Sequence, residues 1–322
     1  MNTGNQDVKR LKIVRKFDLC YHTLMKEKEF LDIIKSYLNS GYIGDDCAYL
    51  RDLGIVITQD SLVEDVHFKM EYTDAYKLGY KSAMVNISDI CASGAEPAYM
   101  TVALSLPANT QNEFIKDFYR GLKDAAKNVT IAGGDITGSE KLFISITVIG
   151  KTAGRTISSR AHAQVGQLVI VSGEHGNSAE GLKKLLKNET CPEKFLNAHL
   201  MPEAERKLSR QIAENIKEPY AMMDTSDGLA DALSQIANSS GVKLTVEYDK
   251  IPHDARVTKE NVLYGGEDYK LVATVPESLL PQLEGAFVIG KVEKGLGVEL
   301  DGILFTEKDI NEKIFNHFGG II

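Results

Sequence analysis

Strand-like and helix-like patterns alternate along this chain, and the alternation starts again after Gly150. Strands and helices that alternate in this way bury their apolar sides against one another in mixed α/β layers. A chain of 322 residues is also about twice the usual domain length of roughly 150 residues. We therefore expect two α/β domains, residues 1–153 and 154–322, which meet in the polar stretch 151–159.

The individual elements follow from the period of the apolar residues. Apolar residues at helical spacing predict helices at residues 27–39, 74–93, 111–128, 203–217 and 228–239. Short apolar or alternating runs predict strands at residues 54–58, 99–106, 142–150, 167–172, 242–248, 270–275 and 286–292.

Composition excludes several classes of protein. The net charge of −8 argues against a nucleic-acid partner that is bound through a broad basic face. No apolar run approaches the roughly 18 residues of a membrane helix, and the first ten residues, MNTGNQDVKR, lack the apolar core of a secretory signal. The cysteines are far apart in the sequence and form no CxxC pair: Cys20, Cys47, Cys91 and Cys191. We expect a cytoplasmic protein without membrane or nucleic-acid partners.

Acidic residues recur beside Gly, Ser or Thr near the ends of predicted elements, where chains turn and sites form. They are Gly44-Asp45-Asp46, Thr58-Gln59-Asp60, Asn86-Ile87-Ser88-Asp89, Gly133-Gly134-Asp135, Asp224-Thr225-Ser226-Asp227-Gly228 and Gly265-Gly266-Glu267-Asp268. Each group alone is ordinarily a turn or a helix cap. As a set they call for another explanation, because Asp60 and Asp135 border strands that look core-like and buried carboxylates are costly unless they are paired or bind metal.

The sequence shows few cationic residues beside these carboxylates, so a divalent metal is the simplest counter-charge. Oxygen ligands suit Mg²⁺ or Ca²⁺, and proteins that gather carboxylates around Mg²⁺ usually handle phosphate. The familiar phosphate motifs are absent from the sequence, including the P-loop, GxGxxG and the kinase HRD and DFG tripeptides.

The ordered motifs resemble the thiamine-monophosphate kinase family, in the superfamily that includes aminoimidazole-ribonucleotide synthetase and selenophosphate synthetase. The matching segments are IGDDCA (43–48), TQDSLVEDVHF (58–68), GYKSAMVNISDICASGAEP (79–97), IAGGDITGS (131–139), SSRAHAQVGQLVIVSGEHGNSAEGL (158–182), MDTSDGL (223–229) and YGGEDYKL (264–271). The resemblance implies a two-domain fold in which the N-terminal sheets of two subunits join into a barrel across a homodimer.

The resemblance also implies roles for individual residues. The implied ligands of several Mg²⁺ ions are Asp46, Thr58, Asp60, Asp89, Asp135, Asp224 and Asp227. The implied ATP contacts are Gly134, Asp135, Arg160 and Ser226, and His67 and Glu267 would face thiamine monophosphate. Asp60, Asp135 and Arg160 would be the catalytic residues of a direct in-line transfer of the γ-phosphoryl group, which gives thiamine diphosphate and ADP.

Some positions depart from the family pattern. Gln59 stands where Thr is usual, and the chain has no Trp to stack on the substrate, for which Phe315 or Phe318 is the candidate replacement. Two alternatives therefore stay open: a paralogous enzyme that acts on another small phosphate or acid, and a non-catalytic ATP-binding homologue. A purely structural protein with acidic turns is the weakest hypothesis, since it predicts no effect of cations on stability.

Overall fold

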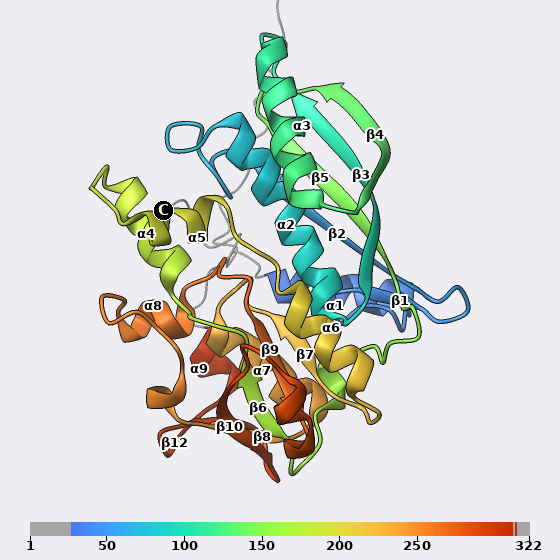
Figure 1. Ribbon diagram of the computed structural model, residues 1–322, viewed down its shortest axis with the longest axis vertical. Coiled ribbons are helices and arrows are strands. Elements are labelled where there is room, and N and C mark those ends of the chain that lie inside the picture. The colour runs from blue at the N-terminus through green and yellow to red at the C-terminus, as the bar shows by residue number, and fades with distance from the viewer. Residues whose placement is uncertain (1–26, 312, 314–322) are drawn as a thin grey trace, which may run out of the picture. The chain divides into compact units, whose positions relative to one another are not determined.

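The computed structural model describes residues 27–311 and 313 of the chain (Figure 1). The chain divides into two compact units, and the helix α1 (Glu27–Leu38) lies in the smaller one, outside residues 40–315. Its apolar stripe is the one that predicted a helix at residues 27–39. The N-terminal stretch 1–26 and the candidate stacking residues Phe315 and Phe318 lie outside the described residues.

A five-stranded sheet occupies the first half of residues 40–315. Its strands are β1 (Ala48–Leu50), β2 (Ile55–Val63), β3 (Glu96–Leu106), β4 (Thr130–Gly138) and β5 (Phe143–Lys151). They are ordered β1-β2-β5-β3-β4, and only the pair β3–β4 is parallel. Alternate residues of β5 are buried, so one face of the sheet packs against the core.

Two helices, α2 (Ala75–Ala92) and α3 (Asn112–Ala126), pack closely side by side over this sheet (Figure 1). Glycines permit the close approach, because a Cβ on Gly79 would lie 2.0 Å from the carbonyl oxygen of Phe118. Asp74 caps α2 by accepting a hydrogen bond from the backbone N–H of Lys77. Most of α2 is buried, including polar residues that the functional site uses.

A seven-stranded sheet occupies the second half. Its strands are β6 (Leu168–Val171), β7 (Met222–Asp224), β8 (Lys243–Val246), β9 (Leu271–Val275), β10 (Phe287–Glu293), β11 (Gly297–Leu300) and β12 (Ile303–Phe305), in the order β12-β11-β8-β10-β6-β9-β7. The helices of this half are α4 (Asn177–Leu186), α5 (Glu193–Leu200), α6 (Arg206–Asn215), α7 (Leu229–Ser240), α8 (Lys259–Tyr264) and α9 (Glu307–Asn311). The helix α7 shares a buried apolar core with strands of this sheet.

The predicted helices and strands are confirmed, with ends that differ by a few residues. The pattern missed the helices α4 and α5 and several shorter elements, and among the missed strands β4 is the most informative. The Gly133-Gly134-Asp135 segment, which alone is typical of a loop, continues as an exposed strand at the edge of the five-stranded sheet. The domain boundary near residues 151–159 stays a prediction.

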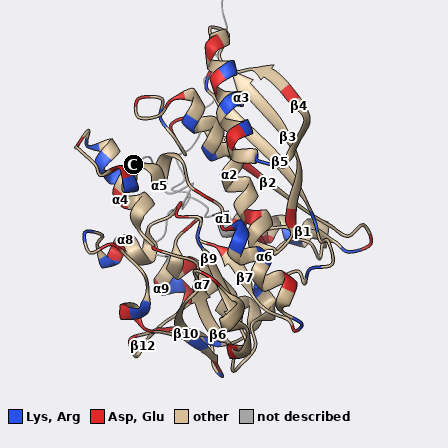
Figure 2. Cartoon of the chain, in the orientation of Figure 1, with Lys and Arg blue, Asp and Glu red and all other residues tan. Residues whose placement is uncertain are grey.

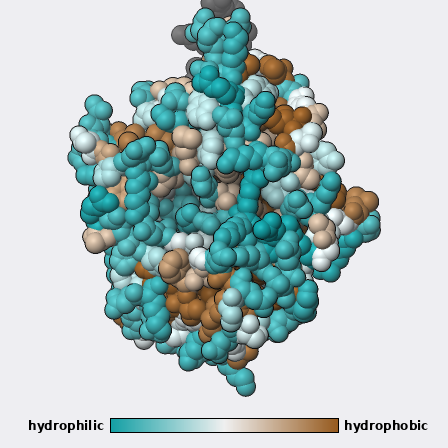
Figure 3. Space-filling model, viewed as in Figure 1, coloured by the Kyte–Doolittle hydropathy of each residue, from teal (hydrophilic) through white to brown (hydrophobic). Residues whose placement is uncertain are grey.

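Charged side chains of both signs are interspersed over the chain (Figure 2), and the face in Figure 3 is mainly hydrophilic. Among residues 27–311 and 313, no helix combines the length and the apolar composition that a membrane span requires.

Candidate functional site

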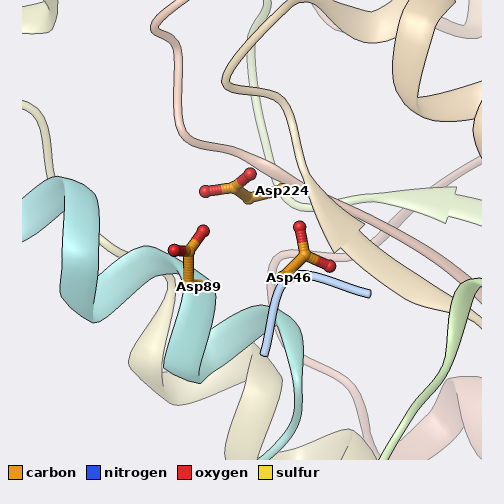
Figure 4. Close-up of side chains that lie close together, drawn as sticks. All are labelled: Asp46, Asp89 and Asp224. Atoms are coloured by element: carbon orange, nitrogen blue, oxygen red, sulfur yellow. The ribbon is translucent and has the colours of Figure 1, made fainter. Parts of the chain in front are cut away.

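Three aspartates from separate segments meet at one point (Figure 4). Asp46 precedes β1, Asp89 lies in the last turn of α2, and Asp224 ends β7. Each offers a carboxylate oxygen, and these oxygens lie within 4.8 Å of one another. The chain therefore gathers three acidic groups from both of its sheets and one helix.

Burial and mutual repulsion disfavour the charged forms of these aspartates. Asp224 is completely buried, and desolvation together with the charges of Asp46 and Asp60 raises its pKa to about 8. The pKa of Asp89 is raised well above its ordinary value by desolvation and then by Asp60, Asp224 and Asp46. Desolvation is the larger cause of both pKa shifts, and a counter-cation would relieve the repulsion that adds to it.

Hydroxyl groups satisfy only part of the cluster. The Thr58 hydroxyl donates a hydrogen bond to Asp89 Oδ2 at 2.5 Å, and the Ser88 hydroxyl donates to Asp224 Oδ2. Asp224 Oδ1 is buried without a hydrogen-bond partner among the described residues. A buried oxygen of this kind, surrounded by further carboxylates, fits a hard divalent cation such as Mg²⁺.

One cation already lies at the cluster. Arg160 Nη2 donates to Asp46 Oδ1 at 2.7 Å, and both side chains are largely buried. The expectation of few cationic partners is therefore wrong for Asp46. The two residues are distant in sequence, so nothing in the local pattern indicates that they pair.

Asp60 lies beside the cluster, and Asp227 follows Asp224 by three residues. The backbone N–H of Asp60, on β2, donates to Asn86 Oδ1 at 2.9 Å, and the charge of Asp60 contributes to the raised pKa of Asp89 and of Asp224. Asp227 lies in the turn before α7, half-buried, where its charge helps to raise the pKa of Tyr269.

Gly134 and Asp135 lie elsewhere in the chain. Both are exposed on β4, and Gly134 is required there because a Cβ would lie 1.7 Å from the carbonyl oxygen of Val102. The register places Asp60 and Gly134 in one row across β2, β5, β3 and β4. Three strand spacings of about 4.8 Å make their Cα atoms roughly 14 Å apart. Asp135 therefore lies within an exposed strand instead of bordering a buried one, and a single chain does not bring it to the cluster.

Glu267 forms a second buried centre. It adopts a positive φ of 64°, and its carboxylate pairs with Lys81 Nζ at 3.0 Å and with His199 Nδ1 at 3.2 Å. These charges and that of His67 lower the pKa of Glu267 although burial acts in the opposite direction. The backbone N–H of Glu267 donates to the carbonyl of Ser226 at 2.7 Å, which ties this turn to the loop before α7. The Nδ1 atom of His67 accepts from the backbone N–H of Val63 at 3.0 Å.

Sequence reasoning gave no role to several residues of this region, although it named Asn86 and Ser88 as neighbours of Asp89. Lys81, Asn86 and Ser88 are buried polar residues of α2, and His199 lies at the end of α5. The sequence signal that could have found the α2 residues is that polar residues occur on the sides of this helix that are buried. Such residues normally need partners inside the protein.

A cavity of about 750 Å³ adjoins the cluster on the side of Asp46. Its lining includes Tyr42, Asp45, Asp46, Ser159 and His162. The site thus combines an acidic cluster, a buried arginine and open space beside them, which suits a ligand with phosphate groups.

This fold and its acidic cluster define a class of protein. The family model of the AIR synthase related protein N-terminal domain matches residues 44–152, and that of the C-terminal domain matches residues 164–302. The first matched region contains the five-stranded sheet, and the second contains the seven-stranded sheet apart from its edge strand β12. The three clustered aspartates come from both regions.

Known relatives show which family within this class the chain belongs to. A thiamine-monophosphate kinase of Aquifex aeolicus is 34% identical over 306 residues, covering 89% of this chain and 96% of the relative. One of Bacillus subtilis is 36% identical, covering 72% and 77%. The solved structure of AaThiL complexed with AMPPCP and TMP has a TM-score of 0.83 at 33% identity, covering 91% of this chain and 97% of that chain. The chain belongs to the thiamine-monophosphate kinase family.

Proposed function

We propose that this chain transfers the γ-phosphoryl group of ATP to the phosphate of thiamine monophosphate, giving thiamine diphosphate and ADP. The observation that carries the proposal is the likeness over nine-tenths of the chain to a structure complexed with AMPPCP and TMP, together with the acidic cluster in the matching fold. We expect the reaction to run in the cytoplasm, with residues 1–153 binding ATP and metal and forming the dimer, and residues 154–322 completing the site.

The residues at the cluster fit Mg²⁺. Asp46, Asp89 and Asp224 would hold it, with Thr58, Asp60 and Asp227 as further ligands. The set is all-oxygen and includes a buried oxygen that has no hydrogen-bond partner in the part of the chain that the structure describes. Bound there, Mg²⁺ would neutralise phosphate charge and orient the γ-phosphoryl group.

The other residues bind and orient. Arg160 would bind phosphate oxygens through its planar guanidinium. Ser226 lies in the turn before the N-terminus of α7, and the partial positive charge of a helix N-terminus favours an anion. The acceptor phosphate is already an anion at neutral pH, because its second pKa is about 6, so the transfer requires no strong general base. His67 and Glu267 would border the acceptor.

We propose further that a second copy of the chain closes the five-stranded sheet into a barrel. Two edges support this idea: β4 is exposed, and β1 pairs only with residues 55–57 of β2, so residues 58–63 have no strand on that side among the described residues. If β4 of one copy pairs with that free edge in a register that sets Asp135 opposite residues 58–63, the partner's Asp135 lies close to Asp60. The dimer would then supply the ligand that one chain does not bring to the cluster.

A direct assay tests the reaction. Purified protein with ATP, MgCl₂ and thiamine monophosphate should form thiamine diphosphate and ADP in equal amounts, as followed by chromatography, and EDTA should stop it. Mg²⁺-dependent binding of ATP without product would favour the paralogous enzyme or the non-catalytic homologue.

Removing a carboxylate at the site tests the residues. Asp60→Asn should reduce turnover by at least about a hundredfold with little loss of stability, because a repelling charge is removed. The exposed Asp249→Asn is the matched control and should leave turnover unchanged. Full activity of Asp60→Asn would refute the assignment of Asp60.

A further inference from the structure

Arg160 is held from several sides. Its Nη2 atom donates to Asp46 Oδ1, and its Nη1 atom donates to Gln235 Oε1. Its backbone N–H donates to Asp45 Oδ1 at 2.7 Å, and its carbonyl accepts from the Ser240 hydroxyl at 2.7 Å. The guanidinium is therefore a fixed part of the site, not a mobile surface group.

One edge of this guanidinium carries two N–H donors, and only one of them has a hydrogen-bond partner among the described residues. In arginine, Nε–H and Nη2–H point in parallel from the same edge, which is the geometry that binds two oxygens of one phosphate. Here Nη2 bonds to Asp46, while Nε is buried without a hydrogen-bond partner among the described residues. A buried N–H donor without a partner, next to one that is already bonded, indicates that this edge of the guanidinium can bind a second acceptor oxygen.

Gln235 holds the opposite side of the group. It lies one helical turn after Asp231 in α7, and its Nε2 atom donates to Asp231 Oδ2. This bond directs the amide oxygen of Gln235 toward Arg160. Because Gln235 uses only Nη1, it can keep the arginine in position whether or not Asp46 remains bonded to Nη2.

The Asp46 bond conflicts with cation binding. Asp46 is one of the three carboxylates of the cluster, and the guanidinium already neutralises it at 2.7 Å. A divalent cation must therefore either bind beside this positive charge or take Asp46 from it. Both cases weaken cation binding relative to a chain without Arg160. Release of Nη2 would in turn complete the parallel pair of donors for a phosphate.

We propose that Arg160 is the resident counter-ion of the acidic cluster, exchanged for the divalent cation when nucleotide binds, and that Gln235 is the positioning residue that holds Arg160 during the exchange. The inference rests on the proposed function, since it needs the cluster to bind a divalent cation and the arginine to bind nucleotide phosphate.

Calorimetric titration with MgCl₂ alone tests the counter-ion role. Arg160→Gln should bind Mg²⁺ about tenfold more tightly than the wild type, because a competing charge is gone, and should bind Mg²⁺–AMPPCP at least about tenfold more weakly. Arg155→Gln is the matched control, because Arg155 is also a largely buried arginine that pairs with carboxylates, Glu96 and Glu214. Mg²⁺ affinity of Arg160→Gln equal to or below that of the wild type would overturn the proposal.

A second variant tests the positioning role without removing the charge. Gln235→Met should leave the affinity for Mg²⁺ alone within about twofold, while the KM for ATP rises at least about fivefold and kcat changes less. An unchanged KM would refute the role of Gln235.

Asp89→Asn separates this inference from the proposed function. If Asp89→Asn loses Mg²⁺ binding while Arg160→Gln keeps the wild-type Mg²⁺ affinity, the cation site stands and only the counter-ion role of Arg160 is refuted. Unaltered Mg²⁺ affinity in Asp89→Asn would refute the cation site itself, and the inference with it.

Discussion

At the scale of single residues, the buried aspartates should make the metal-free protein less stable as pH rises. The pKa of Asp224 is about 8 in the folded chain against an ordinary value of 3.8. The folded state thus binds a proton that the unfolded state has lost, so the free energy of unfolding falls with increasing pH until pH passes about 8. Asp89 acts in the same direction.

The test is thermal unfolding in EDTA between pH 7 and 9. Burial lowers the pKa values of His175 and His199 to about 3. These residues make the free energy of unfolding rise with pH, but only below about pH 6.5. We expect Tm to fall from pH 7 to about pH 8 and to change less above it, and Asp224→Asn to flatten the fall. MgCl₂ should raise Tm most at high pH, because the cation binds the charged carboxylates. A Tm that rises from pH 7 to 9 would contradict the prediction.

The pairing of Lys81 with Glu267 gives a second prediction. The Lys81 side chain is 4% exposed, so Lys81→Met leaves the carboxylate of Glu267 without its main counter-charge. We expect a loss of roughly 3 kcal/mol in the free energy of unfolding, measured with urea.

Lys77→Met is the matched control, because Lys77 pairs with Asp74 on the surface of the same helix, where the loss should stay below about 1 kcal/mol. Adding Glu267→Gln to Lys81→Met should restore part of the stability. Equal effects of the two lysine variants would show that burial of the pair has no energetic consequence.

At the scale of secondary structure, β4 depends on a glycine. Gly134 has a φ of 157°, and any Cβ there would overlap the carbonyl of Val102. Gly134→Ala should therefore cost at least about 2 kcal/mol in unfolding free energy. Gly138→Ala, on the same strand, meets nothing within 4 Å and should cost less than about 0.5 kcal/mol. Urea denaturation of both variants checks the difference.

The same strand shows where prediction from sequence ends. Helices such as α3 were predictable because one-sided apolar spacing directly reflects burial. The strand β4 was not, since its exposed side chains and adjacent glycines mimic a loop. Within the site, the family resemblance grouped Asp46, Asp89 and Asp224 among the metal ligands, whereas the local pattern alone marks them only as acids near the ends of elements. The Arg160–Asp46 pair depends on long-range packing, which the spacing of apolar residues within single elements does not reveal.

At the scale of the whole molecule, an exposed apolar side chain tests the proposed barrel. Ile136, on β4, is 64% exposed. If β4 pairs with a second copy, Ile136→Asp should shift the protein toward monomer in analytical ultracentrifugation and lower turnover in parallel.

Ile303, on β12 of the other sheet, is 62% exposed, so Ile303→Asp introduces the same change at a matched site and should preserve the dimer. A dimer that persists in Ile136→Asp with full activity would argue against pairing through β4.

The contact between Ser88 and Asp224 joins residues 136 positions apart, and it has a consequence for synthesis. A ribosome delivers Asp46 and Asp89 long before Asp224, so the nascent N-terminal half carries only part of the acidic cluster. If the cluster binds Mg²⁺ as proposed, its set of ligands is incomplete until β7 has been synthesised and has packed against α2. The cation would therefore bind late and would stabilise only chains in which both halves have folded and packed together. Chains that stop before this point would lack the stabilisation, so proteases would cleave them more readily.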